Sequence, residues 1–313
     1  MSTTAKAIVA TGASSGLGFE VIKQLLSQSA QPYNFILGVR NVEKTQAAFN
    51  SLNFDRAFHT LTLLPLDLSN LPTVVTFAAQ TLSTLASANL SYLFLNAAIS
   101  EPAGPAEPPR TTNPNDSRWS KTYIVNHLSQ HLLTHFFHPK LIHSQSRIVI
   151  TSSASFREVE DPSAFEHNLL AGSGTPGRKL YAETKFVQLL GAHWWRRNLQ
   201  GTGCVVVAVS PGLVPATNIG TGMGVDFTMD WPGAREIGDG AASIIEAFRR
   251  DDFPENADQV FLTSWGEWWG RDVLEKTLDR ELQDRWCPGK EKIEEDELAG
   301  GGSFLHTRNR SNS

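Results

Sequence analysis

The sequence predicts an α/β protein in which a doubly wound parallel sheet of about seven strands lies between two layers of helices. Three observations support this prediction. Short apolar runs recur along the 313 residues, segments of helical periodicity separate them, and a glycine-rich turn follows the first run directly. Strands that alternate with helices form βαβ units, and their right-handed crossovers place helices on both faces of a single sheet.

Each predicted strand is short and apolar on both faces, which is typical of strands buried in a parallel sheet. The strands are expected at residues 6–10, 33–39, 58–66, 90–95, 146–151, 203–209 and 258–263. The segments between them carry apolar residues at spacings of three and four, the pattern of a helix with one buried face. The helices are expected at residues 16–29, 41–52, 70–86, 117–138, 178–199 and 233–250.

Residues 1–289 are expected to form a single domain, because the chain shows neither an internal repeat nor a second domain. Three segments interrupt the alternation of strand and helix and are predicted to be loops. They span residues 100–117, 154–178 and 213–233, and the glycine-rich third segment is expected to act as a mobile lid. Residues 290–313 are charged and then rich in glycine and serine, which predicts a disordered tail.

The composition argues against several classes of partner and location. The formal net charge is −5 and there is no basic block, so we expect no nucleic-acid partner. No apolar run reaches about 18 residues, so we expect no membrane span, and the N-terminus lacks the apolar core of a secretion signal. Cys204 and Cys287 are expected to be reduced thiols, which favours a cytoplasmic location.

The stretch TGASSGLG at residues 11–18 follows the first predicted strand and opens the first predicted helix. Gly12 can adopt a positive φ, and Gly16 and Gly18 allow another backbone or a ligand to approach closely. The free N–H groups and the dipole at a helix N-terminus attract an anion such as a pyrophosphate. The alternative is a turn that merely joins strand to helix. The predicted dinucleotide cradle consists of Gly12, Ser14, Ser15, Gly16, Leu17 and Gly18.

The ends of the next strands indicate which dinucleotide binds. An acidic residue after the second strand would accept a hydrogen bond from a ribose 2′-hydroxyl, whereas an arginine accommodates a 2′-phosphate. That residue is Arg40, and residues 33–41 contain no Asp or Glu. NADP(H) is therefore favoured over NAD(H), with an ordinary surface arginine as the alternative. Further contacts with the adenosine half are expected from Asp67, Leu68, Asn96, Ala97 and Ala98.

Tyr181 and Lys185 stand at positions i and i+4 of the fifth predicted helix, so both side chains lie on one face. By itself this pair occurs by chance in many helices. Its surroundings are more specific, because TSS ends the fifth strand at 151–153 and SPG ends the sixth at 210–212. Asn126 lies in the helix between the fourth and fifth strands.

With these motifs in this order, the chain resembles the short-chain dehydrogenase/reductase family, in the single-domain branch with TGxxxGxG and YxxxK motifs. The resemblance covers residues 5 to about 265. The variant NAA at 96–98 and the arginine after the second strand make the chain most similar to the subgroup of retinol dehydrogenases and protochlorophyllide reductases. The resemblance implies a Rossmann-type α/β/α sheet that binds NADP(H).

The resemblance also implies a role for each catalytic residue. Tyr181 would give a proton to a carbonyl oxygen, and Lys185 would lower the pKa of that phenol and hold the nicotinamide ribose. Ser153 would stabilise the charge that develops on the oxygen, with Ser152 as the less favoured alternative. Asn126 would hold a water that relays protons to Lys185. Additional cofactor contacts are implied for Pro211, Gly212, Val214 and Thr217.

We therefore expect an NADPH-dependent enzyme that reduces a ketone or aldehyde, or oxidises the matching alcohol. A lipophilic substrate is expected, such as a polyketide-like, terpenoid or retinoid-like compound of secondary metabolism. The three predicted loops would border it. One alternative is isomerisation, cyclisation or dehydration in the same pocket without net hydride transfer; another is a regulator that only binds the cofactor. A homodimer paired through the helices of Asn126 and Tyr181, which is frequent in the family, is left open.

A stripe of histidines runs along the fourth predicted helix. No cysteine or carboxylate joins it at ligand spacing, so we predict no metal site and expect the stripe to pack at an interface. Its members are His127, His131, His135 and His138. The tryptophan-rich segment SWGEWWG at 264–270 is left open between core packing and contact with the substrate.

Overall fold

Seven strands form one sheet in which all neighbouring strands are parallel, in the order β3-β2-β1-β4-β5-β6-β7. The computed structural model describes residues 4–104 and 117–298. The α/β fold with a doubly wound parallel sheet is thereby confirmed. The strands are β1 (Lys6–Thr11), β2 (Tyr33–Val39), β3 (Thr60–Pro65), β4 (Leu90–Leu95), β5 (Arg147–Thr151), β6 (Val205–Val209) and β7 (Phe261–Leu262).

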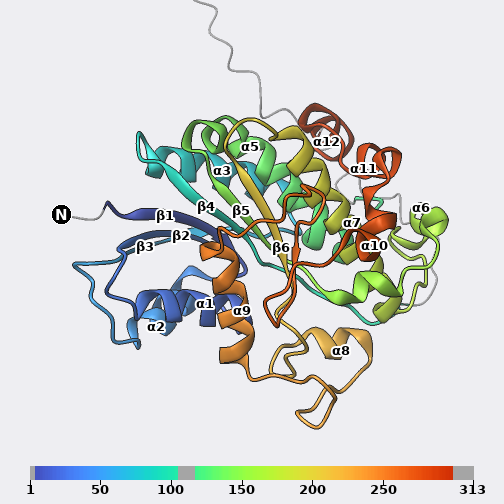
Figure 1. Cartoon of the computed structure of the whole chain (residues 1–313), viewed down its shortest axis with the longest axis horizontal. Coiled ribbons are helices and arrows are strands. Elements are labelled where there is room, and N and C mark those ends of the chain that lie inside the picture. The colour runs from blue at the N-terminus through green and yellow to red at the C-terminus, as the bar shows by residue number, and fades with distance from the viewer. Residues whose placement is uncertain (1–3, 105–116, 299–313) are drawn as a thin grey trace, which may run out of the picture.

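Helices cover both faces of this sheet (Figure 1). One layer contains α1 (Gly16–Leu26), α2 (Val42–Asn50) and α9 (Ile237–Arg249), and the other contains α3 (Leu71–Leu85), α5 (Ser129–Ser144) and α7 (Gly177–Asn198). Successive residues of β1 belong to opposite layers: Ile8 joins the apolar cluster of α1 and α9, and Val9 joins that of α3, α5 and α7. The strands are apolar on both faces for this reason.

The strand order reverses direction between β1 and β4, which are neighbours in the sheet although they are far apart in the chain. The crossovers from β1 run outward through β2 to β3 on one side and through β4 to β7 on the other. At such a reversal the loops that leave the carboxyl ends of the two strands diverge, and a crevice opens between them. The loops after β1 and β4 therefore begin at the place where a ligand fits best.

The helical segment after β4 differs from the helix predicted at 117–138. It consists of α4 (Lys121–Tyr123), a π-helical turn η1 (Ile124–Leu128) and α5, which continues to Ser144. A π-turn inserts one residue into a helix without any compositional signature, and such turns are frequent at functional sites. This turn contains Asn126 and His127.

The segment predicted as a loop at 154–178 contains three short helices, η2 (Ala154–Glu158), η3 (Pro162–Ala164) and α6 (Phe165–Asn168). The fully buried Phe165 anchors it, because its ring packs edge-on against Phe186 of α7 and Trp286. The segment at 213–233 contains one short helix, α8 (Ile219–Met223). Most of the loop predicted at 100–117 lies outside the described residues.

The C-terminal segment forms α10 (Arg271–Leu274), η4 (Glu275–Leu278), α11 (Arg280–Trp286) and α12 (Lys290–Glu297). The predicted disorder of 290–313 is therefore wrong for its first residues, and 299–313 lie outside the described part. Two features of α12 explain the error. Ile293 is buried in the core cluster, and ion pairs four residues apart stabilise the exposed face. Helix α11 contacts α7, and helix α12 contacts α5. A homodimer paired through α5 and α7 stays a prediction.

The histidine stripe of η1 and α5 binds the backbone that joins α11 to α12. Nε2 of His127 lies 2.9 Å from the carbonyl oxygen of Trp286, and Nε2 of His131 lies 3.0 Å from that of Pro288. Nδ1 of His131 accepts a hydrogen bond from the indole of Trp195, so Nε2 carries its proton. Burial lowers the pKa of His127 to about 4 and that of His131 well below its usual range.

These buried neutral histidines predict a loss of stability in acid. Unfolding releases them to bind protons, so the free energy of unfolding is expected to fall as the pH drops from about 6.5 to about 4. His127 alone accounts for up to about 3 kcal/mol of that loss. Urea titrations at several pH values, followed by tryptophan fluorescence, measure it. His127→Gln should flatten the pH dependence, and the exposed His143 offers a control, His143→Gln. An equally steep dependence in His127→Gln would contradict this account.

Candidate active site

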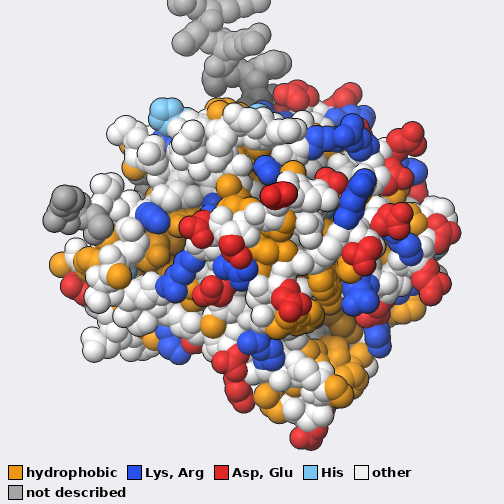
Figure 2. Space-filling view, in the orientation of Figure 1, with side chains coloured by type: hydrophobic (Ala, Val, Ile, Leu, Met, Phe, Trp, Pro, Cys, Tyr) orange, Lys and Arg blue, Asp and Glu red, His pale blue; other side chains and the backbone are white. Residues whose placement is uncertain are grey.

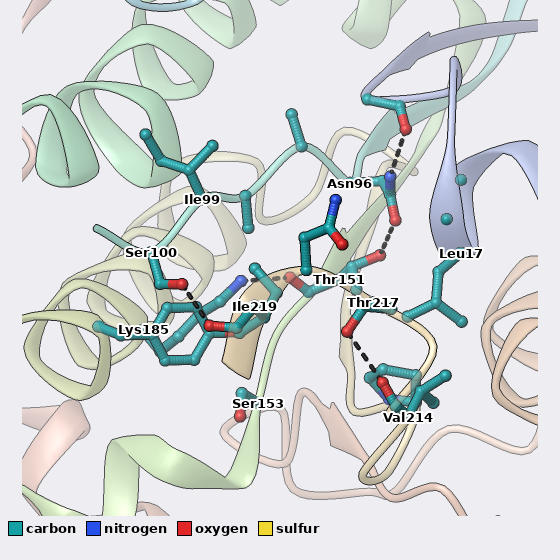
Figure 3. Close-up of a pocket in the computed structure, with 18 of the residues that line it drawn as sticks. Leu17, Asn96, Ile99, Ser100, Thr151, Ser153, Lys185, Val214, Thr217 and Ile219 are labelled. Carbon is teal, nitrogen blue, oxygen red and sulfur yellow. Dashed lines mark hydrogen bonds between the residues drawn. The ribbon is translucent and has the colours of Figure 1, made fainter. Parts of the chain in front are cut away.

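A cavity of about 1260 Å³ lies at the carboxyl edge of the sheet, between the loops that follow β1 to β7. Figure 3 shows part of its lining, with Leu17 contributed by α1, Lys185 by α7, and Asn96 and Ser153 by the loops after β4 and β5. Every residue predicted to contact the cofactor lines this one cavity. The set comprises Gly12, Ser14, Ser15, Gly16, Leu17, Gly18, Arg40, Asp67, Leu68, Asn96, Ala97, Ala98, Tyr181, Lys185, Pro211, Gly212, Val214 and Thr217.

The glycines of the first turn are required by its geometry. Gly12 has a φ of 67°, and a Cβ there would lie 2.6 Å from Cα of Ala97. A Cβ on Gly18 would overlap the carbonyl oxygen of Gly12. Gly16 has a φ of 56°, and a Cβ there would meet no atom within 4 Å, because this position faces the open cavity. Only glycine fits the close contacts at positions 12 and 18, and glycine at position 16 leaves the backbone accessible to a ligand.

The N-terminus of α1 is left open to that ligand. Its N-cap residue, Ser15, makes no side-chain capping bond, and the first turn of the helix contains no acidic residue. Gly16, Leu17 and Gly18 of this turn line the cavity. Uncapped N–H groups and the positive end of the helix dipole are the features that bind phosphate groups. These residues fit the pyrophosphate of a dinucleotide.

Hydrogen bonds of Thr11 hold the loop after β4 against the end of β1. Its hydroxyl oxygen accepts bonds from the backbone N–H groups of Asn96 (3.1 Å) and Ala97 (3.2 Å), and donates to the side chain of Gln130 (3.1 Å). Oδ1 of Asn96 accepts a bond from the hydroxyl of Thr151 at the end of β5 (Figure 3). Three neighbouring strand ends are thereby fixed relative to one another.

Arg40 and Asp67 stand at the outer end of the cavity. Arg40 is exposed at the end of β2 and lines the cavity, and the adjacent Asn41 caps α2 through a 2.8 Å bond to the N–H of Lys44. Oδ1 of Asp67 accepts bonds from the backbone and the hydroxyl of Ser69. Asp67 therefore stabilises its own loop, and the guanidinium of Arg40 faces solvent beside the cavity.

Ser153 and Tyr181 lie together at the inner end. The hydroxyl oxygen of Ser153 accepts bonds from the backbone N–H and the hydroxyl of Ser155, the latter at 2.9 Å. Burial raises the pKa of Tyr181 well above its usual range, and a hydrogen bond with Ser153 partly opposes this effect. This direction differs from the expectation that Lys185 lowers the pKa of the phenol, because in the free protein burial is the larger effect.

Lys185 lines the cavity and is fully buried. Its ammonium group donates to the carbonyl oxygen of Thr151 at 2.9 Å and to Oε1 of Gln188 at 3.2 Å, and it lies 5.6 Å from the ring centre of Tyr181. Burial lowers the pKa of Lys185 to about 7. The lysine can therefore change its charge near neutral pH, which is rare for an exposed lysine.

Asn126 is the one predicted catalytic residue that does not line this cavity. Its side chain accepts a bond from the N–H of Ile99 at 2.8 Å, and donates to the carbonyl of Ile99 at 2.9 Å and the hydroxyl of Thr184 at 3.0 Å. Its backbone carbonyl accepts bonds from Gln130 and Gln188. Asn126 therefore ties the loop after β4 to α7 behind the cavity.

Aromatic and apolar side chains from the segment after α8 and from the loop after β7 line a third part of the cavity, which we call its open end. Phe227 and Trp231 pack edge-on in the segment after α8, and Trp265 is 63% exposed at the rim. Figure 2 shows apolar surface gathered over the region of α8. In SWGEWWG, Trp269 stacks on the core residue Phe261 whereas Trp265 lines the cavity. Contact of this segment with a substrate stays a prediction.

Sequence reasoning did not identify the residues that contact the predicted catalytic set, among them Ser155 and Gln188 in addition to Ile99 and Thr184. Ser155 is bonded to Ser153, and Gln188 is bonded to Lys185. Position i+2 after a catalytic serine and i+3 after a catalytic lysine could have drawn attention to them. Their partners, however, are fixed only by the turn of η2 and by the packing of α7.

Known proteins resemble this chain over most of its length. Residues 6–164 match the short chain dehydrogenase family. Short-chain dehydrogenase/reductase GME11359 of Pestalotiopsis microspora is 51% identical over 296 residues, which cover 93% of this chain and 99% of that protein. Retinol dehydrogenase 12 of Homo sapiens is 28% identical over 211 residues, which cover 67% of this chain and 61% of that protein.

A solved structure has the same fold. The crystal structure of NADPH-bound carbonyl reductase from chicken fatty liver superposes with a TM-score of 0.63 at 17% identity, and the match covers 85% of this chain and 99% of that one. The family match spans half of the chain, and the relative from Pestalotiopsis microspora extends it to nearly all of it. The chain belongs to the short-chain dehydrogenase/reductase family of oxidoreductases, with retinol dehydrogenases among its relatives.

Proposed function

We propose that this protein is an NADPH-dependent oxidoreductase that reduces a ketone or aldehyde of a lipophilic small molecule, or oxidises the matching alcohol. One observation carries the proposal: the glycine cradle, Arg40 and the group of Ser153, Tyr181 and Lys185 line a single cavity. A dinucleotide bound along that cavity would extend from Arg40 toward Tyr181. The cytoplasmic location of this reaction stays a prediction. Among the described residues, no helix has the length and apolar character to cross a bilayer.

The residues of the chain suit NADP(H) at each part of the cavity. The open N-terminus of α1 would bind the pyrophosphate, and the guanidinium of Arg40 would pair with a 2′-phosphate. Pro211, Gly212 and Val214 would border the nicotinamide. When bound there, the cofactor supplies a hydride. The protein supplies orientation and electrostatics.

The side chains at the inner end are suited to protonate a carbonyl oxygen. The Ser153 hydroxyl is held by Ser155 and hydrogen-bonded with Tyr181, so a substrate oxygen placed between Ser153 and Tyr181 would take a hydrogen bond from this hydroxyl. Because its pKa is raised, Tyr181 holds its phenolic proton at neutral pH and donates it as charge develops on that oxygen. The ammonium of Lys185 then stabilises the resulting phenolate in a site of low dielectric. Asn126 supports this arrangement from behind, through Ile99 and Thr184.

The lining at the open end supports a lipophilic substrate. Val125, Phe227, Trp231 and Trp265 present apolar surface in the cavity that Ser153 and Tyr181 also line. Such surface favours the burial of a hydrocarbon or aromatic body next to the reacting carbonyl group. The ion pair of Glu158 and Arg178 at the rim is exposed, so it adds little to binding an apolar body.

Arg40 is predicted to select the phosphorylated cofactor. Arg40→Gln removes a charge-assisted bond to phosphate, so NADPH affinity should fall about tenfold to a hundredfold while NADH affinity stays nearly constant. Titrations that follow nicotinamide fluorescence excited through the tryptophans measure both constants. Lys44→Gln removes an equal charge from α2, outside the cavity, and should leave both unchanged. Parallel losses of NADPH affinity in the two variants would contradict a specific role of Arg40.

Tyr181 is predicted to be essential for carbonyl reduction. Tyr181→Phe removes the proton donor, so NADPH oxidation with an aromatic ketone or aldehyde panel should fall by about 10²-fold to 10⁴-fold with cofactor binding retained. Tyr123→Phe is the control, because this buried tyrosine lies outside the cavity. Unchanged NADPH oxidation in Tyr181→Phe would contradict the mechanism. Substrate conversion by the wild type without NADPH consumption would instead favour isomerisation, cyclisation or dehydration.

A further inference from the structure

The side chain of Gln188 connects Lys185 to the π-turn that contains Asn126. Gln188 lies one turn after Lys185 on α7 and is 5% exposed. Its Oε1 accepts a bond from the ammonium of Lys185 at 3.2 Å. Its Nε2 donates to the backbone carbonyl of Asn126 at 3.2 Å. One amide thus bonds to both Lys185 and Asn126, the residues between which the family resemblance implies a water.

The two partners fix the orientation of this amide. An ammonium only donates and a carbonyl only accepts, so Oε1 must face Lys185 and Nε2 must face Asn126. A flipped amide would place its NH₂ group against the donating ammonium of Lys185 and its oxygen against the accepting carbonyl of Asn126. The carbonyl of Asn126 is accessible to side chains within the π-turn η1, and Nε2 of Gln130 also donates to it at 3.2 Å. Gln188 is therefore bonded to the backbone of the π-turn itself.

We propose that Gln188 is a positioning residue for the proposed reaction: its amide holds Lys185 in place and in the charged form by connecting the ammonium to the backbone of Asn126. This inference rests on the proposed carbonyl reduction. Without Gln188 the ammonium would keep one of the two acceptors described here, the carbonyl of Thr151. A buried ammonium with fewer acceptors loses its proton more readily.

The titratable groups around Lys185 do not replace this interaction. Tyr181 lies on the same helix and is neutral because burial raises its pKa. His127 of η1 and His131 of α5 line a small cavity of about 20 Å³ that Gln188 also lines. Burial lowers the pKa of both imidazoles, so they are neutral at the pH of the reaction. In this surrounding, the side-chain acceptor of Lys185 is the amide of Gln188.

The direct test is the titration of Lys185 in the free protein, followed by carbon-13 NMR of labelled lysines and assigned with Lys185→Arg. Gln188→Met has a similar size but no acceptor, and should lower the midpoint of Lys185 by about one pH unit. Gln188→Glu places a carboxylate at the same site and should raise the midpoint by at least as much. Gln80→Met, on the exposed side of α3, should leave it unchanged.

Steady-state kinetics provide the second readout. The pH at which kcat begins to fall should move in the same direction as the Lys185 midpoint in each variant, with a loss of about tenfold in kcat for Gln188→Met at alkaline pH. Midpoints that coincide in Gln188→Met, Gln188→Glu and the wild type would overturn the proposal. If Gln188→Met does not fold, Gln188→Glu alone decides it by the presence or absence of an upward shift. A wild type that reduces no carbonyl would refute the proposed function, whereas the lysine titration would still decide the role of Gln188.

Discussion

The hydrogen bonds of the Thr11 hydroxyl, at the point where the strand order reverses, are the interaction on which the site depends. This one oxygen fixes the backbone of Asn96 and Ala97 against the end of β1. The close approach of Gly12 to Ala97 follows from it, since the two loops leave neighbouring strands. A side chain larger than hydrogen at Gly12 would separate them. The glycine cradle after β1 and the loop after β4 are therefore held together as one unit.

The inner end of the cavity combines two buried titratable groups, and burial disfavours the charged form of each. Burial favours the neutral forms of both Tyr181 and Lys185, so the free protein holds a phenol beside a lysine with a pKa of about 7. The proposed proton transfer converts the phenol to a phenolate, and the two groups then stabilise each other's charge. The site is arranged for the state after proton transfer, and the bonds to Thr151 and Gln188 keep the ammonium in place until then.

The sequence predicted those features that short local patterns determine. Each buried strand is an apolar run, and the cradle is a glycine pattern between a strand and a helix, so both were located to within a few residues. The π-turn at Ile124–Leu128 has no such pattern, because the inserted residue that changes its hydrogen bonds has no compositional signature. Helix α12 was missed since a single apolar residue, Ile293, anchors a charged segment. The link between Gln188 and Asn126 joins elements 62 residues apart, so it depends on packing that the sequence alone did not indicate.

A crystal structure of the protein with NADPH tests the central claim most directly, because that claim assigns a direction to the cofactor along one cavity. The account predicts the pyrophosphate at the N-terminus of α1, the 2′-phosphate at the guanidinium of Arg40 and the nicotinamide beside Tyr181 and Ser153. A dinucleotide with its nicotinamide at the Arg40 end, or bound outside this cavity, would contradict the account.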